Sequence, residues 1–133
     1  MSETDCKPKA LLWTIWRLSV GAVYENVVAQ ELHAHGYSLY YYNSKKKGEL
    51  DFVVEHAGRV LPIEVKSGKN YEKHSALDNV LAVAEYGIEE AYVFTNDNVK
   101  VDGKLTYFPI YMAMFLQDDP IDFIDISVDK FKL

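Results

Sequence analysis

The chain has 133 residues, 49% of them hydrophobic, and these values predict a single domain with a substantial core. Its one cysteine excludes an internal disulfide framework and a cysteine-based zinc site, and is consistent with a reducing cytoplasm. The net charge of −6 weighs against a dedicated high-affinity nucleic-acid binder, which usually presents a basic face. A nuclease stays open, because active-site carboxylates add to the negative count. The polar, acidic start does not resemble a signal peptide, and no apolar run is long enough to span a bilayer.

The first third of the chain is predicted to be helical. Residues 1–9 are polar, and the strongly apolar stretch at residues 11–20 is expected to form a helix or a contact between chains. Residues 21–35 carry apolar side chains at helical spacing, namely Val23, Val27, Val28 and Leu32. Gly36 follows with the chemistry of a C-cap.

Strands dominate the middle of the chain. Alternating apolar residues and turn signals predict strands at residues 38–43, 50–55, 60–66, 90–95, 99–101 and 105–108. A helix is expected at residues 75–86, with Ser75 as its N-cap, and another from Pro109 to about residue 116. This order of helix, three strands, helix and strand predicts an α/β sandwich with a mixed sheet.

Both ends of the chain carry unusual apolar side chains. Residues 121–133 alternate apolar and acidic residues, which predicts an added edge strand or a docking tail. Together with Trp13 and Trp16, this tail has more apolar area than a lone domain should leave in water. We therefore expect a homodimer. The rival interpretation is that both ends fold back and complete a monomer.

The most informative feature is an acidic pattern on two successive strands. The sequence Gly-Glu-Leu-Asp-Phe at residues 48–52 opens one strand, and Ile-Glu-Val-Lys at residues 63–66 closes the next. Strand side chains alternate between faces, so Glu64 and Lys66 are expected to point the same way. A hairpin between the two strands would bring Asp51 beside Glu64. Two carboxylates and an ammonium on one face can hold a hard divalent cation and activate a water against a phosphodiester.

This pattern resembles the PD-(D/E)xK nuclease superfamily. The helix at residues 21–32 is similar to that superfamily's first helix, with Glu25 as its acid near the metal. The stretch from residue 21 to about 116 resembles more closely a nuclease-like domain of unknown function at the C-terminal end of prokaryotic AAA-type ATPases. The resemblance implies a three-layer α/β/α sandwich with a restriction-endonuclease-like core. It departs in one respect, because the chain has no ATPase phosphate-binding motif.

The resemblance assigns roles to four residues. Asp51 and Glu64 would hold Mg²⁺ or Mn²⁺, with the carbonyl oxygen of Val65 as a further candidate ligand. Lys66 would orient the attacking water or stabilise charge on the phosphate. Glu25 would hold a metal-bound water or a second cation. The competing interpretation is a salt bridge among surface charges on a half-exposed sheet.

Other polar residues are assigned weaker roles. Lys45, Lys46 and Lys47 form a loop that could contact phosphates or simply be a solvated turn, and Lys69 and Lys73 could approach the same cleft. Glu49 is interpreted as a charge on the turn that points away from Asp51, and Glu31 as structural. The four histidines at positions 33, 35, 56 and 74 are interpreted as surface or boundary residues. The tyrosine run at residues 40–42 is assigned mainly to the core.

These predictions divide the chain into an N-terminal segment at residues 1–19, a nuclease-like domain at 20–117 and an acidic amphipathic tail at 118–133. The expected function is Mg²⁺-dependent hydrolysis of DNA phosphodiesters. The alternative is a non-catalytic regulatory or protein-interaction domain that accompanies an ATPase module and keeps a relict metal site.

Overall fold

The structure is a computed structural model that describes the backbone of residues 8–118 and the side chains of residues 21–118. The elements follow in the order α1 (Pro8–Ala34), β1 (Tyr40–Ser44), β2 (Gly48–His56), β3 (Arg59–Lys66), α2 (Ser75–Leu81), the 3₁₀ helix η1 (Ala84–Tyr86), β4 (Ala91–Thr95), β5 (Lys100–Asp102), β6 (Leu105–Pro109) and the 3₁₀ helix η2 (Ile110–Phe115). The fold is therefore α/β, as the sequence predicts. Trp13, Trp16 and the tail after residue 118 lie outside the described side chains.

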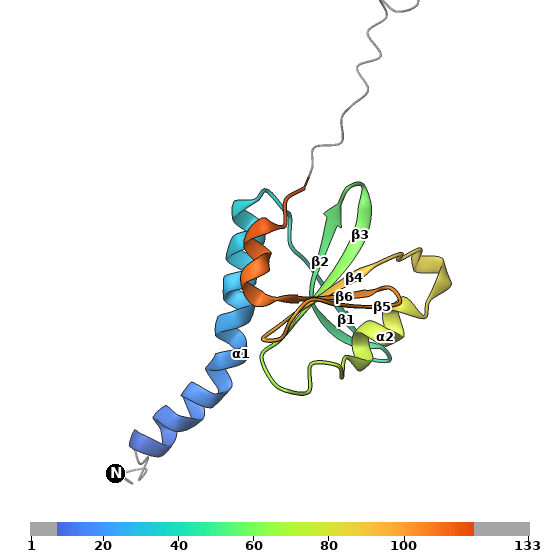
Figure 1. The fold of residues 1–133 in the computed structure, drawn as a ribbon. Coiled ribbons are helices and arrows are strands. Elements are labelled where there is room, and N and C mark those ends of the chain that lie inside the picture. Colours follow the sequence, from blue (N-terminus) through green and yellow to red (C-terminus); the bar gives the residue numbers. More distant parts are fainter. Residues whose placement is uncertain (1–7, 119–133) are drawn as a thin grey trace, which may run out of the picture.

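The strands form one mixed sheet in the order β1-β2-β3-β4-β6-β5. β1, β2 and β3 are antiparallel to one another, whereas β3, β4 and β6 run parallel and β5 pairs antiparallel with β6 at the edge. α1 lies along one side of the sheet with η2 beside it, and α2 lies on the other side (Figure 1). The parallel pair β3 and β4 places the ends of both strands at the same edge of the sheet.

Two buried clusters form the core. The first, here called the α1-side cluster, joins α1 and η2 to strand residues such as Leu61, Ile63, Val65 and Phe94. The second, the α2-side cluster, joins α2 to residues such as Ala91, Val93, Leu105 and Tyr107. Successive residues of β4 thus alternate between the two clusters, as the pleat of a strand requires.

α1 is one continuous helix that crosses the boundary placed after residue 19. Among the described side chains of α1, Val28 and Leu32 are buried, while Val23 and Val27 are exposed, so the predicted apolar stripe was only half right. Gly36 ends the helix as predicted, with a φ of +88°. The N–H of Tyr37 donates to the carbonyl of Leu32, the hydrogen bond typical of a glycine-terminated helix.

β2 contains a bulge directly at the candidate acid. Tyr40 pairs with Val53 and Tyr42 with Leu50, so β2 uses three steps where β1 uses two. Leu50 consequently joins the α2-side cluster, whereas Phe52 joins the α1-side cluster. A bulge of this kind bends the strand and redirects the side chains within it. Asp51 lies inside the bulge.

Two predicted helices are shorter or tighter than expected. α2 ends at Leu81, because Val83 adopts an extended backbone before η1 begins. The N-cap is His74, and Ser75 is already helical, so the assignment of Ser75 as the cap was wrong. After β6, Pro109 ends the strand and the chain continues as a 3₁₀ helix instead of an α-helix.

Two side-chain assignments also need correction. Tyr40 and Tyr41 are 60% and 75% exposed, because β1 is the edge strand and the bulge alters its register with β2. Of the tyrosine run, only Tyr42 packs against the core, in the α2-side cluster. His74 is buried at the start of α2, where its Nε2 lies 2.7 Å from the Tyr107 hydroxyl, and is not a surface residue.

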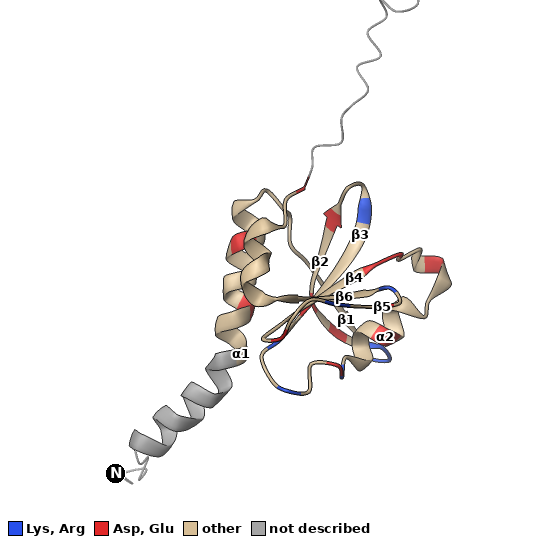
Figure 2. Ribbon diagram, in the orientation of Figure 1, with Lys and Arg blue, Asp and Glu red and all other residues tan. Residues whose placement is uncertain are grey.

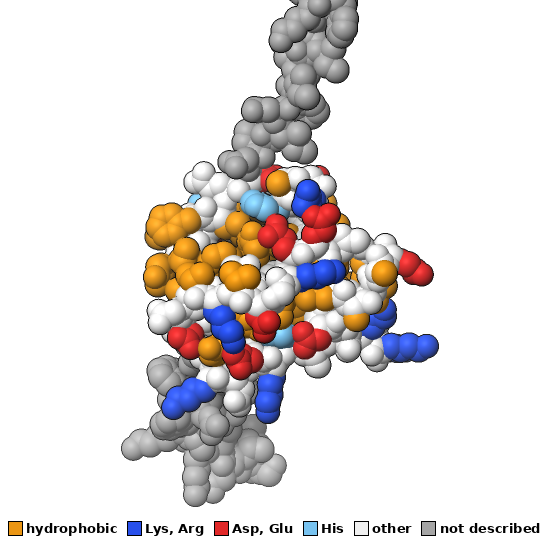
Figure 3. All heavy atoms as spheres, turned by 45° about the vertical axis from the view of Figure 1, so that its right-hand side comes forward, with side chains coloured by type: hydrophobic (Ala, Val, Ile, Leu, Met, Phe, Trp, Pro, Cys, Tyr) orange, Lys and Arg blue, Asp and Glu red, His pale blue; other side chains and the backbone are white. Residues whose placement is uncertain are grey.

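Charged residues of both signs are spread along the described part of the ribbon (Figure 2). In the space-filling view, hydrophobic side chains gather on one side of the visible face, and acidic and basic side chains are interspersed elsewhere (Figure 3). Within the described residues, no helix is long and apolar enough to cross a membrane.

Candidate functional site

The site begins where β2 and β3 separate. Their last ladder pair at this end is Phe52 with Ile63, and the same register places Asp51 opposite Glu64. Beyond that pair, the carboxylate oxygen Oδ2 of Asp51 accepts a hydrogen bond from the backbone N–H of Val65 at 2.7 Å. The side chain of Asp51 is thereby fixed against the strand that carries Glu64 and Lys66.

Glu64 and Lys66 share one face of β3, as the alternation predicts. The Lys66 ammonium lies 2.9 Å from the Glu64 carboxylate. Glu64 is only 3% exposed, whereas about a third of the Lys66 side chain remains open to solvent. A buried carboxylate requires such a partner, because an isolated buried charge is costly. Lys66 therefore places its charge at the site while part of its side chain stays accessible to solvent.

Glu25 reaches the same region from α1. A cavity of about 190 Å³ opens between α1, β1 and β2, and its walls include Glu25, Asn26, Tyr41, Glu49 and Asp51. Gly21, one turn before Glu25, passes near Ser67 at the end of β3, where a Cβ atom would lie 3.8 Å from the Ser67 hydroxyl. The helical acid thus approaches the strand acids as predicted.

Burial controls the electrostatics of the three acids. Desolvation raises the pKa of Asp51 above its ordinary value, and the Val65 N–H and Lys66 oppose this rise. Desolvation likewise raises the pKa of Glu64, against the hydrogen bond from Lys66. The pKa of Glu25 is raised by desolvation and then by the charge of Asp51. The acids therefore influence one another and share the influence of Lys66.

The sequence interpretation missed Glu49. It lines the cavity together with Asp51 and Glu25, and its charge helps to raise the pKa of both. Its interpretation as a turn charge directed away from Asp51 overlooked this shared cavity. Residues two apart on a regular strand point to the same face, but the bulge at Asp51 interrupts that alternation in β2.

The predicted lysines are not gathered at the acids. Lys45 and Lys46 are exposed in the β1–β2 turn, and Lys47 lies 5.2 Å from the ring centre of Tyr86, beside α2. Lys69 lines a separate cavity beyond Lys66, and Lys73 is exposed just before α2. Lys69 is the one of these five lysines closest in sequence to Lys66, three residues further along the chain.

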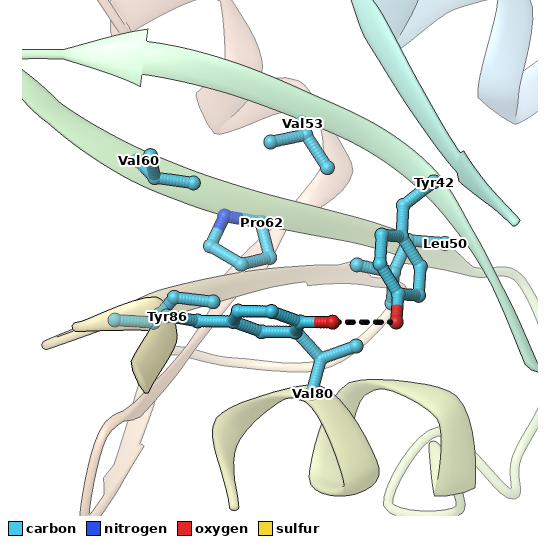
Figure 4. A pocket seen from close by; sticks show the side chains of 8 residues that line it. Tyr42, Leu50, Val53, Val60, Pro62, Val80 and Tyr86 are labelled. Atoms are coloured by element: carbon cyan, nitrogen blue, oxygen red, sulfur yellow. Dashed lines mark hydrogen bonds between the residues drawn. The ribbon is translucent and has the colours of Figure 1, made fainter. Parts of the chain in front are cut away.

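A further, apolar cavity is lined by none of the candidate acids. It has a volume of about 250 Å³ and lies between the β2–β3 hairpin, α2 and η1. Val53, Val60, Pro62 and Val80 line it, and the hydroxyls of Tyr42 and Tyr86 meet at its rim, 3.3 Å apart (Figure 4). Apart from the two tyrosine hydroxyls, the side chains that line this cavity are apolar.

The arrangement of the acids bears on which kind of cation they could hold. Across the described residues, no set of three or more His, Cys, Asp or Glu side chains is arranged to hold a metal ion. Such a cage is typical of zinc. Mg²⁺ is usually bound by one or two carboxylates, waters and substrate phosphates. The oxygen donors Asp51 and Glu64 are compatible with that second kind of site.

Comparison with known proteins identifies the family. Residues 20–112, more than half of the chain and including all four candidate residues, match the domain of unknown function DUF4143. No curated protein and no solved structure matches the chain. The chain therefore belongs to the DUF4143 family.

Proposed function

We propose that this domain is a nuclease-like hydrolase of the PD-(D/E)xK type, with a three-layer α/β/α sandwich and a restriction-endonuclease-like core. The observation that carries the proposal is the placement of Asp51 on the N–H of Val65, directly beside the ion pair of Glu64 and Lys66. Two acids and a lysine on adjacent strands, approached by Glu25 from a helix, match the sequence pattern of that superfamily.

Asp51 and Glu64 are the proposed ligands of Mg²⁺ or Mn²⁺. One oxygen of each carboxylate is already used, by the Val65 N–H and by Lys66. The second oxygen of each carboxylate makes no hydrogen bond to another described residue. The Val65 carbonyl oxygen is a further candidate ligand of the cation. The raised pKa values of both acids reflect desolvation of negative charge, which a nearby cation would relieve. A divalent cation supplies charge at a phosphoryl oxygen and activates the attacking water.

Lys66 is the proposed electrostatic partner of the phosphate. Its ammonium is held at a defined position by Glu64, and a third of its side chain is open to solvent. A fixed cation near developing negative charge stabilises the transition state without reorganising. Glu25 is proposed to orient water from the α1 side of the site. Glu49, which shares its cavity, adds negative charge there.

DNA is the proposed substrate, contacted weakly by Lys69 and by the more distant Lys45, Lys46, Lys47 and Lys73. The proposed setting is the cytoplasm, with an ATPase module as partner in related longer proteins. The second candidate is a non-catalytic interaction domain. The exposed apolar side chains of Tyr111, Met114 and Phe115 on η2 favour it, because contiguous apolar surface marks contact sites.

A cleavage assay tests the catalytic proposal. The full-length protein is incubated with plasmid and with labelled single strands in Mn²⁺, and compared with Lys66→Ala. We expect the variant to lose about 10²–10³-fold in rate, as for other transition-state contacts. Arg59→Ala is the matched control, because Arg59 pairs with Glu89 on the exposed hairpin turn. Equal rates for wild type and Lys66→Ala would exclude the assigned role, and absence of cleavage by the wild type would favour the interaction domain.

A further inference from the structure

A second polar cavity lies directly beyond Lys66. It has a volume of about 360 Å³, and its walls are Ser67, Gly68, Lys69 and Tyr71 from the loop after β3, and Asn96 and Asp97 from the turn after β4. Lys66 and Thr95 pair at the ends of these parallel strands, so the cavity opens at their carboxyl ends. Ligands of open α/β sheets characteristically bind outside the carboxyl ends of such strands.

The two loops are cross-linked into a fixed shape. The Asn96 side-chain amide donates to the Ser67 carbonyl at 2.8 Å, and the Tyr71 hydroxyl donates to Asp97 at 2.9 Å. The Tyr71 ring also packs edge-on against Tyr107, with 5.6 Å between ring centres. The aromatic wall is therefore held in place before any ligand arrives, which reduces the ordering cost of binding.

The walls divide by chemistry. Lys69 supplies positive charge in the wall, and Lys66 directly precedes the wall residue Ser67 in the chain. The Asn98 N–H and the Tyr71 hydroxyl hold the pKa of the wall residue Asp97 below its ordinary value. Asp97 therefore stays ionised and can accept hydrogen bonds from amino or hydroxyl groups, but would repel a phosphate. Tyr71 adds an aromatic ring to the wall.

We propose that this cavity holds one nucleotide unit of a single-stranded nucleic acid, with its phosphate at Lys66 and Lys69 and its base against Tyr71. This inference rests on the proposed function, since it names the form of the substrate at that site. A phosphate, a base and a sugar are the three chemistries that suit a lysine, an aromatic ring and a hydrogen-bond acceptor among the wall residues. A single strand is required, because the bases of a duplex are stacked and paired and so cannot enter a pocket.

Binding can be measured without catalysis. A short fluorescent oligothymidylate is titrated with the full-length chain in EDTA, so that neither metal nor cleavage affects the result. Tyr71→Ala should weaken binding by about fivefold or more, the range expected for a lost base–aromatic stack. Tyr71→Phe retains the ring and should bind within about twofold of wild type. Tyr111→Ala, at an exposed tyrosine on η2, is the matched control and should bind as wild type.

A second variant fills the cavity instead of removing a wall. A Cβ atom at Gly68 would meet no atom within 4 Å, and the backbone there is outside the left-handed region, so Gly68→Leu should fold normally. It should also weaken binding of the oligothymidylate. A duplex of matched length should show no dependence on Tyr71.

The outcomes separate this inference from the proposed function. If oligothymidylate binding in EDTA depends on Tyr71 but the wild type cleaves nothing in Mn²⁺, the proposed cavity is supported and the proposed nuclease activity is rejected. If the wild type cleaves nucleic acid while Tyr71→Ala and Gly68→Leu both bind the oligothymidylate as tightly as the wild type, the proposed cavity is rejected and the proposed nuclease stands. Absence of any oligothymidylate binding by the wild type, or an equal loss with duplex, would overturn the inference.

Discussion

The Asp51 carboxylate accepts the backbone N–H of Val65 at 2.7 Å, at the point where the ladder between β2 and β3 has ended. A side chain thus takes the place of a strand partner. The hydrogen bond stabilises the ionised carboxylate, while burial opposes ionisation. Asp51 is consequently a fixed, partly desolvated anion, which is the physical condition that favours a bound cation.

The first prediction concerns Asp51→Asn in metal-free buffer. The asparagine carbonyl can still accept the Val65 N–H, but the variant has no charge to desolvate. Because the pKa of Asp51 is raised on folding, the stability linked to its protonation is complete below its unfolded pKa and is lost as pH rises through the folded pKa. Asp51→Asn should therefore unfold at a higher temperature than wild type at pH 8, and the difference should shrink in acid.

Thermal unfolding at several pH values in EDTA measures this difference. Glu55→Gln is the matched control, because Glu55 is exposed on the same strand. If Asp51→Asn is less stable than wild type at pH 8, desolvation is not the dominant influence on Asp51.

The second prediction concerns cation binding. Mn²⁺ should raise the unfolding temperature of the wild type, because a ligand that binds only the folded chain stabilises it. The rise should be lost in Asp51→Asn and retained in Glu55→Gln. Calorimetric titration checks that the rise reflects binding at one site. An equal Mn²⁺ response in all three proteins would remove Asp51 from the ligand set.

Features set by residues close together in the sequence could be predicted, whereas features set by residues far apart in the sequence could not. The strands carrying Asp51, Glu64 and Lys66 were predicted correctly, because alternation and turn residues are local signals. The bulge at Asp51 was not predicted, because it depends on the pairing of β2 with the edge strand β1. The burial of His74 was also missed, because it depends on Tyr107, which lies 33 residues further along the chain.

The third prediction tests that buried contact. Tyr107→Phe removes the hydroxyl 2.7 Å from His74 Nε2. The other ring nitrogen of His74 lies 2.9 Å from the Asp78 carboxylate, which suits an ion pair, although it lacks the geometry of a hydrogen bond. The variant should lose about 1–3 kcal/mol of unfolding free energy, the cost of leaving a buried polar group unsatisfied.

Urea unfolding at neutral pH measures this loss. Tyr92→Phe is the control, because its hydroxyl makes only a 3.5 Å contact with Glu90 and should contribute little. Equal stability of Tyr107→Phe and wild type would mean that water replaces the lost hydroxyl.

The fourth prediction concerns association. Tyr111 and Phe115 on η2 are 68% and 67% exposed, and the apolar tail follows directly after this segment in the sequence. We expect the full-length chain to be a homodimer, because closed two-fold contacts are the commonest way to cover such surface. Light scattering on the full-length chain and on a version ending at Asp118 checks this. A monomeric mass for the full-length chain at high concentration would contradict it, and a dimer that survives truncation would exclude the tail.

The central claim is that Asp51 and Glu64 hold a divalent cation beside Lys66. Anomalous diffraction from crystals soaked in Mn²⁺ tests it most directly, because the anomalous signal locates the metal itself. The account predicts a peak within ligand distance of one oxygen of Asp51 and one of Glu64, and no such peak in Asp51→Asn crystals. Wild-type crystals with no peak there, and with the Glu64–Lys66 ion pair unchanged, would contradict it.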